Sequence, residues 1–432
     1  MKRVLLLVAL IAQVGVNFTL AQCVGGNRYK LPVFGYDSVI NLVYGQNVTA
    51  TSSLVQDLKL DIYLPTNDTL QKRPLIFFTH GGSFVTGSKA NGDVVYLCKE
   101  FAKRGYVCVS QDYRIGMEEF NTQSAARAVW RAMQDARAAI RYMKANAATY
   151  RVDTNMIIYG GSSAGGFTAL HAAFLDQPNE VLPLIDTSAY SGVGSTGLGN
   201  FRGTTNNLPN SSDGIKAVVN LCGAIGDTAW IQAKDKNVVV ISMHGTADQT
   251  VPYGTAVIKL LNVIPLLEVD GSYSIHKNLQ RNNHENYFYT YCGSDHVPFA
   301  GLTLTQKAWM DTTIRFVSKY LYEKVLKCGN SEIMVSSRID SNDCKRTGLN
   351  EELSSAKNFK IYPNPSFGSV SIKHDFDGIS TCSIYDVKGQ KILQVELREK
   401  LLELDTKNFA QGIYLVKLEH LSNVYLEKLI VE

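Results

Sequence analysis

A regular alternation of strand-like and helix-like segments, from Leu58 to about Lys327, constrains this 432-residue chain more than any other feature. Short runs of β-branched and other apolar residues are separated by longer stretches with apolar residues at every third or fourth position. This alternation is typical of an α/β domain, a mostly parallel sheet with helices on both faces. The clearest helix is expected at Ser124–Ala147, behind a polar start. The predicted strands are Leu58–Leu64, Leu75–Thr79, Tyr106–Gln111, Met156–Tyr159, Ala217–Leu221, Val238–Met243 and Tyr287–Tyr291.

The segment from Asp176 to Ile215 interrupts the alternation. It is rich in Pro, Gly, Ser, Thr and Asn and has no apolar period. A loop of this length within a compact domain is usually functional or flexible. Because it follows the helix expected at Phe167–Phe174, we expect it to shape the binding pocket.

The C-terminal region has a different character. We interpret the polar stretch 328–357 as a linker that follows a first domain at 22–327. From 358 to 432, short strand-like runs are separated by turn signals such as Lys388-Gly389, a pattern that predicts a small all-β sandwich. Its expected strands are Val370–Lys373, Ser383–Asp386, Ile392–Val395, Ile413–Leu418 and Val424–Val431.

The N-terminus has the features of an export signal. Positive charge at Lys2 and Arg3 precedes the apolar run Val4–Ala12, and Thr19-Leu20-Ala21 provides the small residues of a cleavage site. We therefore predict a signal peptide at 1–21 and an exported mature protein. The alternative is a lipoprotein acylated at Cys23, although the preceding Gln fits that poorly. No later run reaches the roughly 18 apolar residues of a membrane-spanning helix.

Charge and cysteine content narrow the possible partners. Lys and Arg total 43 and Asp and Glu total 39, so the net charge of +4 argues against nucleic acid as a partner. The eight cysteines permit disulfides in an exported chain, but their pairing cannot be deduced. Cys98 and Cys108 lie in apolar segments and are expected to be buried thiols, whereas Cys328 and Cys344 could close a local loop. Without CxxC or HExxH spacing, no metal site is expected.

The strongest functional signal is the segment 161–165, which reads Gly-Ser-Ser-Ala-Gly. It lies between the strand Met156–Tyr159 and the helix Phe167–Phe174. A G-x-S-x-G sequence in that position is typical of a nucleophile elbow, a sharp turn that exposes the central serine at a helix N-terminus. We therefore predict that Ser163 is a nucleophile.

A serine nucleophile needs a base to accept its proton and an acid to orient that base. Asp248 follows the strand Val238–Met243 and is the predicted acid, with Asp227 as the runner-up. Of the histidines after Asp248, His276 lies in a helical pattern and His284 precedes the last strand. Only His296 follows that strand, so it is the predicted base, with its neighbour Asp295 exposed or structural.

Acyl transfer also needs hydrogen-bond donors directed at the developing oxyanion. The segment His80-Gly-Gly-Ser-Phe84 follows the strand Leu75–Thr79, and its small residues allow backbone amides to approach a substrate. We predict that the amides of Gly82, Ser83 and Ala164 form the oxyanion hole, and that His80 shapes the loop.

Two glycine patterns indicate other chemistry less well. Gly192–Gly197 matches G-x-G-x-x-G, but no strand precedes it and no helix follows, so it does not predict dinucleotide binding. Gly82–Lys89 resembles a phosphate-binding loop whose last residues are in the wrong order, and the oxyanion interpretation explains it better.

From about Asp57 to Leu326 the chain resembles the α/β-hydrolase superfamily, in particular the carboxylesterases and lipases similar to hormone-sensitive lipase and to bacterial feruloyl esterases. The resemblance implies hydrolysis of carboxylic esters through an acyl-enzyme, without a cofactor. One departure is the Gly-Gly-Ser oxyanion loop, which replaces the three glycines of many members and puts in doubt a preference for bulky tertiary-alcohol esters. The matching segments, in the family's order, are Leu60-Asp-Ile-Tyr-Leu-Pro65, His80-Gly-Gly-Ser-Phe84, Asp112-Tyr-Arg114, Gly161-Ser-Ser-Ala-Gly165, His244-Gly-Thr-Ala-Asp248 and Asp295-His296.

The tail resembles the type A sorting domain of the type IX secretion system of Bacteroidota. The resemblance implies that the secretion machinery is a partner, that the chain crosses the periplasm and the outer membrane, and that it is then released or attached to the surface. A carbohydrate-binding sandwich is the alternative that these motifs argue against. They are Ile361-Tyr-Pro-Asn-Pro365, Ile384-Tyr-Asp-Val-Lys-Gly389 and Ala410-Gln-Gly-Ile-Tyr-Leu-Val416.

Together these features predict a secreted serine carboxylesterase. Export favours a substrate too large to import, such as acetylated or feruloylated plant polysaccharide. Two alternatives stay open. A peptidase similar to prolyl oligopeptidase shares the order of the triad but fits the His-Gly-Gly loop less well, and a surface binding protein would have kept the fold and lost catalysis.

Overall fold

The structure is a computed structural model in which the chain forms two compact units, one up to Ser341 and one from Asn342. The predicted signal peptide, most of the predicted linker and the predicted turn at Lys388-Gly389 lie outside the described residues. Those described are 23, 26–52, 54–192, 195–208, 214–260, 264–301, 303–335, 344, 359–376, 378–386, 390–420 and 423–432.

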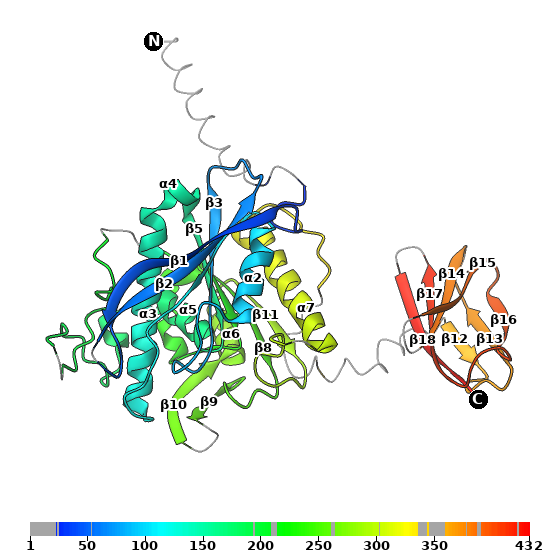
Figure 1. The fold of residues 1–432 in the computed structure, drawn as a ribbon. Helices are drawn as coiled ribbons and strands as arrows, with labels where there is room; N and C mark the ends of the chain where they lie inside the picture. The colour runs from blue at the N-terminus through cyan, green and yellow to red at the C-terminus, as the bar shows by residue number, and fades with distance from the viewer. Residues whose placement is uncertain are drawn as a thin grey trace, which may run out of the picture. The chain divides into compact units, whose positions relative to one another are not determined.

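The first unit is built on an eight-stranded sheet of order β1-β2-β4-β3-β5-β6-β8-β11 (Figure 1). The pairs β1/β2 and β2/β4 are antiparallel and every other neighbouring pair is parallel. This is the predicted α/β architecture. The strands are β1 Gly35–Val48, β2 Val55–Thr66, β3 Arg73–Thr79, β4 Val107–Gln111, β5 Val152–Ser162, β6 Ala217–Leu221, β8 Val239–Gly245 and β11 Asn286–Tyr291.

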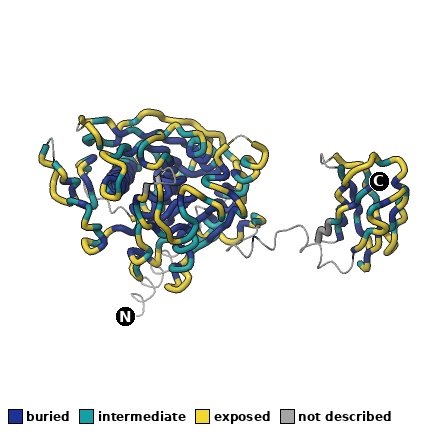
Figure 2. Tube along the Cα trace, turned by 90° about the horizontal axis from the view of Figure 1, so that it is seen from below, coloured by how far each residue is buried: buried dark blue, intermediate teal, exposed yellow. Residues whose placement is uncertain are grey.

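Helices cover both faces of this sheet, because successive strand side chains alternate between the faces. In the fully buried β3, Leu75 and Phe77 belong to one hydrophobic cluster, with α3 and α5, whereas Ile76 and Phe78 belong to another, with α2 and α7. Figure 2 shows the buried interior between these layers. The helices are α2 Gly92–Ala102, α3 Thr122–Ala145, α4 Ala147–Tyr150, α5 Ala164–Phe174, α6 Ser272–Arg281 and α7 Leu304–Tyr320.

Several strands of the first unit were absent from the sequence prediction. The edge strand β1 is mostly exposed, so it lacks the apolar run that marks a buried strand. A second sheet, of order β7-β10-β9, is antiparallel, and its strands lie in the chain between β6 and β11 of the main sheet. It comprises β7 Ala224–Ile225, β9 Thr255–Leu260 and β10 Ile264–Gly271. By contrast, the segment after α5 is mostly irregular, as predicted.

The second unit is all-β, as predicted, with one sheet of order β12-β13-β16 and another of order β15-β14-β17-β18. Its buried residues, among them Val370, Ile384 and Val416, form one hydrophobic cluster. The strands β12 and β16 were not predicted. The bounds are β12 Phe359–Tyr362, β13 Ser369–His374, β14 Ser380–Asp386, β15 Lys391–Leu397, β16 Leu401–Asp405, β17 Gly412–His420 and β18 Asn423–Val431.

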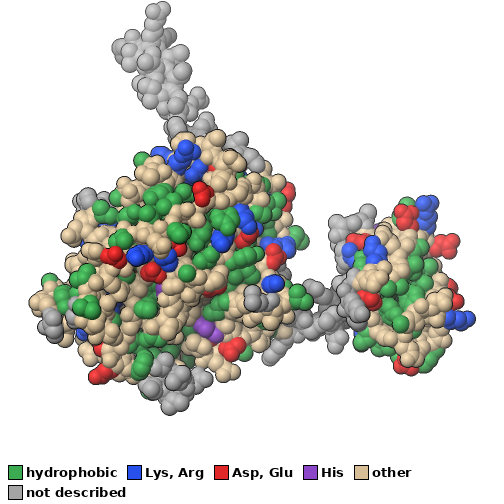
Figure 3. Space-filling model, in the orientation of Figure 1, with side chains coloured by type: hydrophobic (Ala, Val, Ile, Leu, Met, Phe, Trp, Pro, Cys, Tyr) green, Lys and Arg blue, Asp and Glu red, His purple; other side chains and the backbone are tan. Residues whose placement is uncertain are grey.

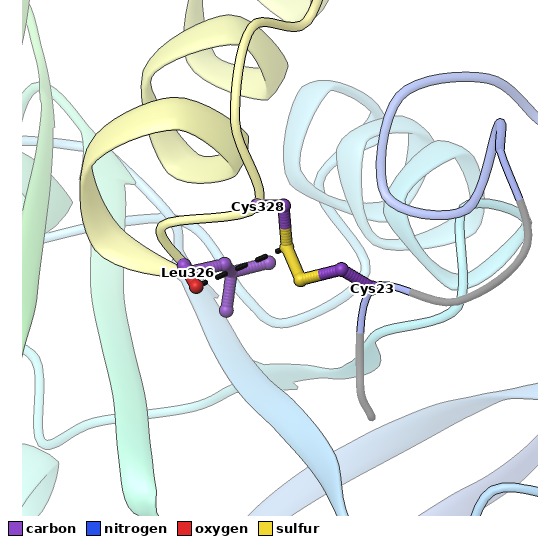
Figure 4. The surroundings of a disulfide bond; sticks show 3 residues. All are labelled: Cys23, Leu326 and Cys328. Atoms are coloured by element: carbon purple, nitrogen blue, oxygen red, sulfur yellow. Dashed lines mark hydrogen bonds between the residues drawn. A yellow bond between two sulfur atoms is a disulfide. The ribbon is translucent and has the colours of Figure 1, made fainter. Parts of the chain in front are cut away.

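A disulfide joins Cys23 to Cys328, with 5.5 Å between their Cα atoms (Figure 4). The suggested local loop between Cys328 and Cys344 is therefore wrong, because Cys328 already has a partner 305 positions away. Cys98 and Cys108 are buried free thiols, as predicted. The Cys23 sulfur cannot carry a thioether-linked lipid while it is in a disulfide, which argues against the lipoprotein alternative.

The surface drawn in Figure 3 carries acidic and basic side chains interspersed with one another, in keeping with the small net charge. Within the described parts of the chain, no helix has the length and apolar character to span a membrane.

Candidate active site

Ser163 lies at a sharp turn between β5 and α5. Its φ of +56° is in the left-handed region, which a non-glycine residue seldom adopts. The flanking glycines allow the turn, since a Cβ added to Gly165 would lie 2.0 Å from the carbonyl oxygen of Thr79. The side chain is thereby held at the carboxyl end of β5, as the elbow pattern predicts.

The structure brings His296 and Asp248 together with Ser163. His296 Nε2 lies 2.8 Å from the Ser163 Oγ, and His296 Nδ1 lies 2.7 Å from Asp248 Oδ2. Ser163 follows β5, Asp248 follows β8 and His296 follows β11. The three side chains therefore meet at one edge of the parallel sheet. With Nδ1–H donating to the carboxylate, Nε2 is left to accept the serine proton.

Backbone amides, as well as His296, hold the Asp248 carboxylate in place. Its Oδ1 accepts hydrogen bonds from the backbone amides of Thr250 (2.9 Å) and Val251 (2.8 Å). Its carboxylate is fully buried. Burial alone would raise the pKa of this carboxyl, but hydrogen bonds from His244 and His296 outweigh it and hold the pKa well below its usual range.

His244 is the residue of this site that sequence reasoning missed. Its fully buried Nε2 lies 3.1 Å from Asp248 Oδ2 and 3.1 Å from the Val251 carbonyl oxygen, and the Ser272 hydroxyl lies 2.7 Å from its Nδ1. Because a carbonyl oxygen only accepts, Nε2–H donates. The carboxylate oxygen thus lies between two imidazoles. The spacing of His244 four positions before Asp248 was the available signal.

The other candidate acids and histidines have structural partners elsewhere. Asp227 caps a short helical turn by accepting from the Ala229 amide. His276 contacts Asn286, and His284 Nε2 contacts the Val238 carbonyl. Exposed Asp295 accepts from the amides of Gln249 and His296, so it holds the histidine loop.

The predicted oxyanion donors lie around the same serine. Ser83 and Ala164 line the cavity that contains Ser163, and neither they nor Gly82 donate a backbone hydrogen bond to another described residue. Gly82 has a φ of +109°, and a Cβ there would lie 2.2 Å from the Thr86 carbonyl oxygen, so only glycine fits. Three amides are thus left for an incoming oxygen.

His80 shapes the loop that carries these amides, as expected. Its Nδ1 donates to the Gly81 carbonyl at 2.7 Å, and its ring stacks on Tyr113 with 4.3 Å between centroids. The Tyr113 hydroxyl donates in turn to the His80 carbonyl. Burial lowers the pKa of His80, so the ring is neutral near pH 7. Lys89, at the end of the phosphate-loop-like segment, pairs with Asp61 instead.

A cavity of about 300 Å³ opens at Ser163 and is mainly apolar. Its walls come from the oxyanion loop, α3, α5 and the β9–β10 hairpin. The prediction that Asp176–Ile215 shapes this cavity is wrong for the described residues, because the hairpin occupies that place. Part of that loop, 179–185, lines an adjacent cavity instead. The residues that line the cavity at Ser163 include Phe84, Met117, Val129, Phe167, Ile258, Leu266, Leu267 and Val269.

Comparison with known proteins identifies both units. Residues 60–260 match the family described as BD-FAE, a family of α/β-hydrolase esterases. The first unit therefore has an α/β-hydrolase fold. Residues 360–432, in the second unit, match the family described as the secretion system C-terminal sorting domain.

Curated relatives match a limited part of this α/β-hydrolase. Carboxylesterase 3B of Mus musculus is 33% identical over 134 residues, which is 30% of this chain and 23% of the mouse protein. Esterase LipC of Mycobacterium tuberculosis is 32% identical over 143 residues, 32% of this chain and 33% of LipC. The chain thus spans a third or less of these relatives' length.

Solved structures similar to part of this chain include Thermogutta terrifontis esterase 2 phosphoramylated by tabun. The two sequences are 22% identical, the alignment covers 66% of this chain and 94% of the esterase chain, and the TM-score is 0.44. For the apo form of the same esterase, the alignment covers 68% of this chain and 95% of the esterase chain, with a TM-score of 0.43.

Proposed function

We propose that this protein is a secreted serine carboxylesterase. Ser163 attacks the ester carbonyl while His296 accepts its proton, and Asp248 stabilises the resulting imidazolium. The imidazolium then protonates the leaving alcohol, which leaves an acyl-enzyme. Water, deprotonated by the same histidine, releases the acid and restores the serine.

The observation that carries this proposal is the continuous hydrogen-bonded chain from Ser163 through His296 to Asp248. Its two links measure 2.8 Å and 2.7 Å, which is the range for a nucleophile and base poised for proton transfer. The amides of Gly82, Ser83 and Ala164 are the proposed oxyanion donors, and such groups typically contribute most of the electrostatic stabilisation in acyl transfer. The cycle requires no cofactor.

The sorting-domain match supports export. We propose that residues 1–21 are removed as a signal peptide, that 22–327 is the catalytic domain, and that 358–432 engages the type IX secretion machinery beyond a linker at 328–357. The mature enzyme is then released or attached to the cell surface. A surface enzyme meets polymers that cells cannot import, so feruloylated or acetylated plant polysaccharide is the proposed substrate.

The test is hydrolysis by the purified full-length protein, with Ser163→Ala as its matched control. Substrates are short and long nitrophenyl esters, methyl ferulate, acetylated xylan and a prolyl amide. We expect ester turnover that falls at least about 10³-fold in the variant. If only the prolyl amide is hydrolysed, the protein is a peptidase and the esterase proposal is wrong. Inactivity on all substrates, together with failure of a fluorophosphonate to label Ser163, would favour a binding protein.

A further inference from the structure

A second cavity lies behind the one that opens at Ser163. It measures about 440 Å³, and both cavities fall in the size range of small-molecule sites. It lies between α3, α5, β10 and the loop 179–185. Four side chains line both cavities, so the partition between them is one side chain thick. They are Val129, Phe167, Leu267 and Val269.

The side of Ser163 on which these cavities lie identifies which half of an ester would enter them. A leaving alcohol takes its proton from His296, so it must lie beside that histidine. His296 lines neither cavity, whereas Ala164, beside the oxyanion position, lines the first. The acyl group therefore points into the first cavity and, if it is long enough, toward the second.

His171 gives the second cavity a specific polar character. This residue of α5 is 4% exposed, and its Nδ1 lies 2.8 Å from the Phe167 carbonyl oxygen, to which it must donate. Burial lowers the pKa of His171 to about 4, so the ring is neutral near pH 7 and Nε2 is an acceptor. Within the described residues Nε2 has no hydrogen-bond partner, although the ring lines the cavity.

The remaining polar groups of the cavity favour a hydroxyl over an anionic group. Trp230 packs edge to face with His171 at 5.6 Å, and its indole N–H has no partner among the residues described. A hydroxyl both donates and accepts, so it can satisfy a neutral imidazole and an indole together. The exposed carboxylates of Asp227 and Glu268, which also line the cavity, would repel an anionic end group.

We propose that this second cavity is a distal acyl subsite, which binds the far end of an extended acyl group that carries a hydroxyl rather than an anionic end group. The inference rests on the proposed esterase function and adds the substrate class. It predicts that hydroxyl-terminated acyl esters are preferred to methyl-terminated esters of equal length.

The experiment compares kcat/KM for nitrophenyl dodecanoate and nitrophenyl 12-hydroxydodecanoate with the full-length protein, with nitrophenyl acetate as reference. We expect the hydroxyl ester to be favoured by about fivefold to tenfold, the worth of one buried neutral hydrogen bond. In His171→Phe, which keeps a ring but removes the acceptor, that ratio should fall to about one. A ratio near one in the unmodified protein, or an unchanged preference in the variant, would overturn the subsite.

A second variant guards against a folding defect in His171→Phe. Val181→Trp fills the cavity from the half-buried loop 179–185, and it should lower the dodecanoate-to-acetate ratio at least about fivefold. An unchanged ratio would contradict the proposal. Failure of the esterase function itself would look different, because the unmodified protein would then hydrolyse no ester, acetate included.

Discussion

Removal of one partner of the buried ion pair between Arg114 and Asp135 should strongly destabilise the first unit. Arg114 donates to both carboxylate oxygens of Asp135, through its backbone amide at 2.8 Å and through Nε at 2.9 and 3.1 Å. The Thr205 hydroxyl donates to the same carboxylate at 2.6 Å. The exposed fractions of the two side chains are 3% and 0%, so water cannot replace these contacts. The pair ties α3 to the chain that follows β4, beside the oxyanion loop.

Asp135→Asn keeps the shape of the side chain and removes its charge. The guanidinium of Arg114 is then buried without a counter-ion, and the new amide group faces donors, so the free energy of unfolding should fall by about 3–5 kcal/mol. For a domain of about 300 residues, with an unfolding entropy of about 2.1 cal/mol/K per residue, this lowers Tm by about 5–8 °C.

The assay is differential scanning calorimetry of the full-length protein, with Asp311→Asn as the matched control. Asp311 also pairs with an arginine, but at 3.7 Å and with side chains 66% and 48% exposed. Its replacement should move Tm by less than about 1 °C. A fall of less than about 2 °C for Asp135→Asn, or equal falls for both variants, would refute the reasoning.

Three further predictions concern the site and the disulfide. His244→Phe should lower kcat/KM for nitrophenyl acetate by roughly 10- to 100-fold, because Asp248 loses a charge-assisted hydrogen bond; unchanged kinetics would remove His244 from the site. The folded pKa of Asp248 is depressed, so its stabilising contribution is present above its unfolded pKa of about 3.9 and is lost as the pH falls below that value. Urea titrations between pH 3 and pH 7 should therefore show a shallower acid-side loss for Asp248→Asn, and equal slopes would contradict this. Cys23→Ser should lower the free energy of unfolding by up to about 5 kcal/mol, and Cys328→Ser should match it, as calorimetry can check. Different effects of the two cysteine variants would show that the disulfide is not their common cause.

Local sequence patterns were enough to predict the features that depend on one strand and the loop that follows it. Short apolar runs mark the buried parts of β3, β5 and β6, at Leu75–Phe78, Met156–Tyr159 and Ala217–Val219. The residues that follow β5, β8 and β11 are those that meet at the sheet edge. Strand order along the chain therefore allowed Ser163, Asp248 and His296 to be chosen from many serines, acids and histidines.

Features that depend on contacts distant in sequence were missed. The partner of Cys328 lies 305 positions away, and no local pattern encodes that distance. The exposed edge strand β1 has no apolar run, since only one face of it packs on the domain. Asp248 is only four positions from His244, but the Ser272 hydroxyl that contacts the other nitrogen of its ring lies beyond the β9–β10 hairpin.

The β9–β10 hairpin explains why the reaction could be predicted more readily than the substrate. It lies in the chain between Asp248 and His296 and lines both cavities, yet it contributes no member of the hydrogen-bonded triad. Triad geometry is set by the ends of buried parallel strands, whose patterns are strong. In the proposed enzyme, acyl preference would depend on a partly exposed antiparallel pair, whose pattern is weak. Substitutions in this hairpin can therefore change the preferred acyl group while the positions of the serine, histidine and aspartate stay fixed.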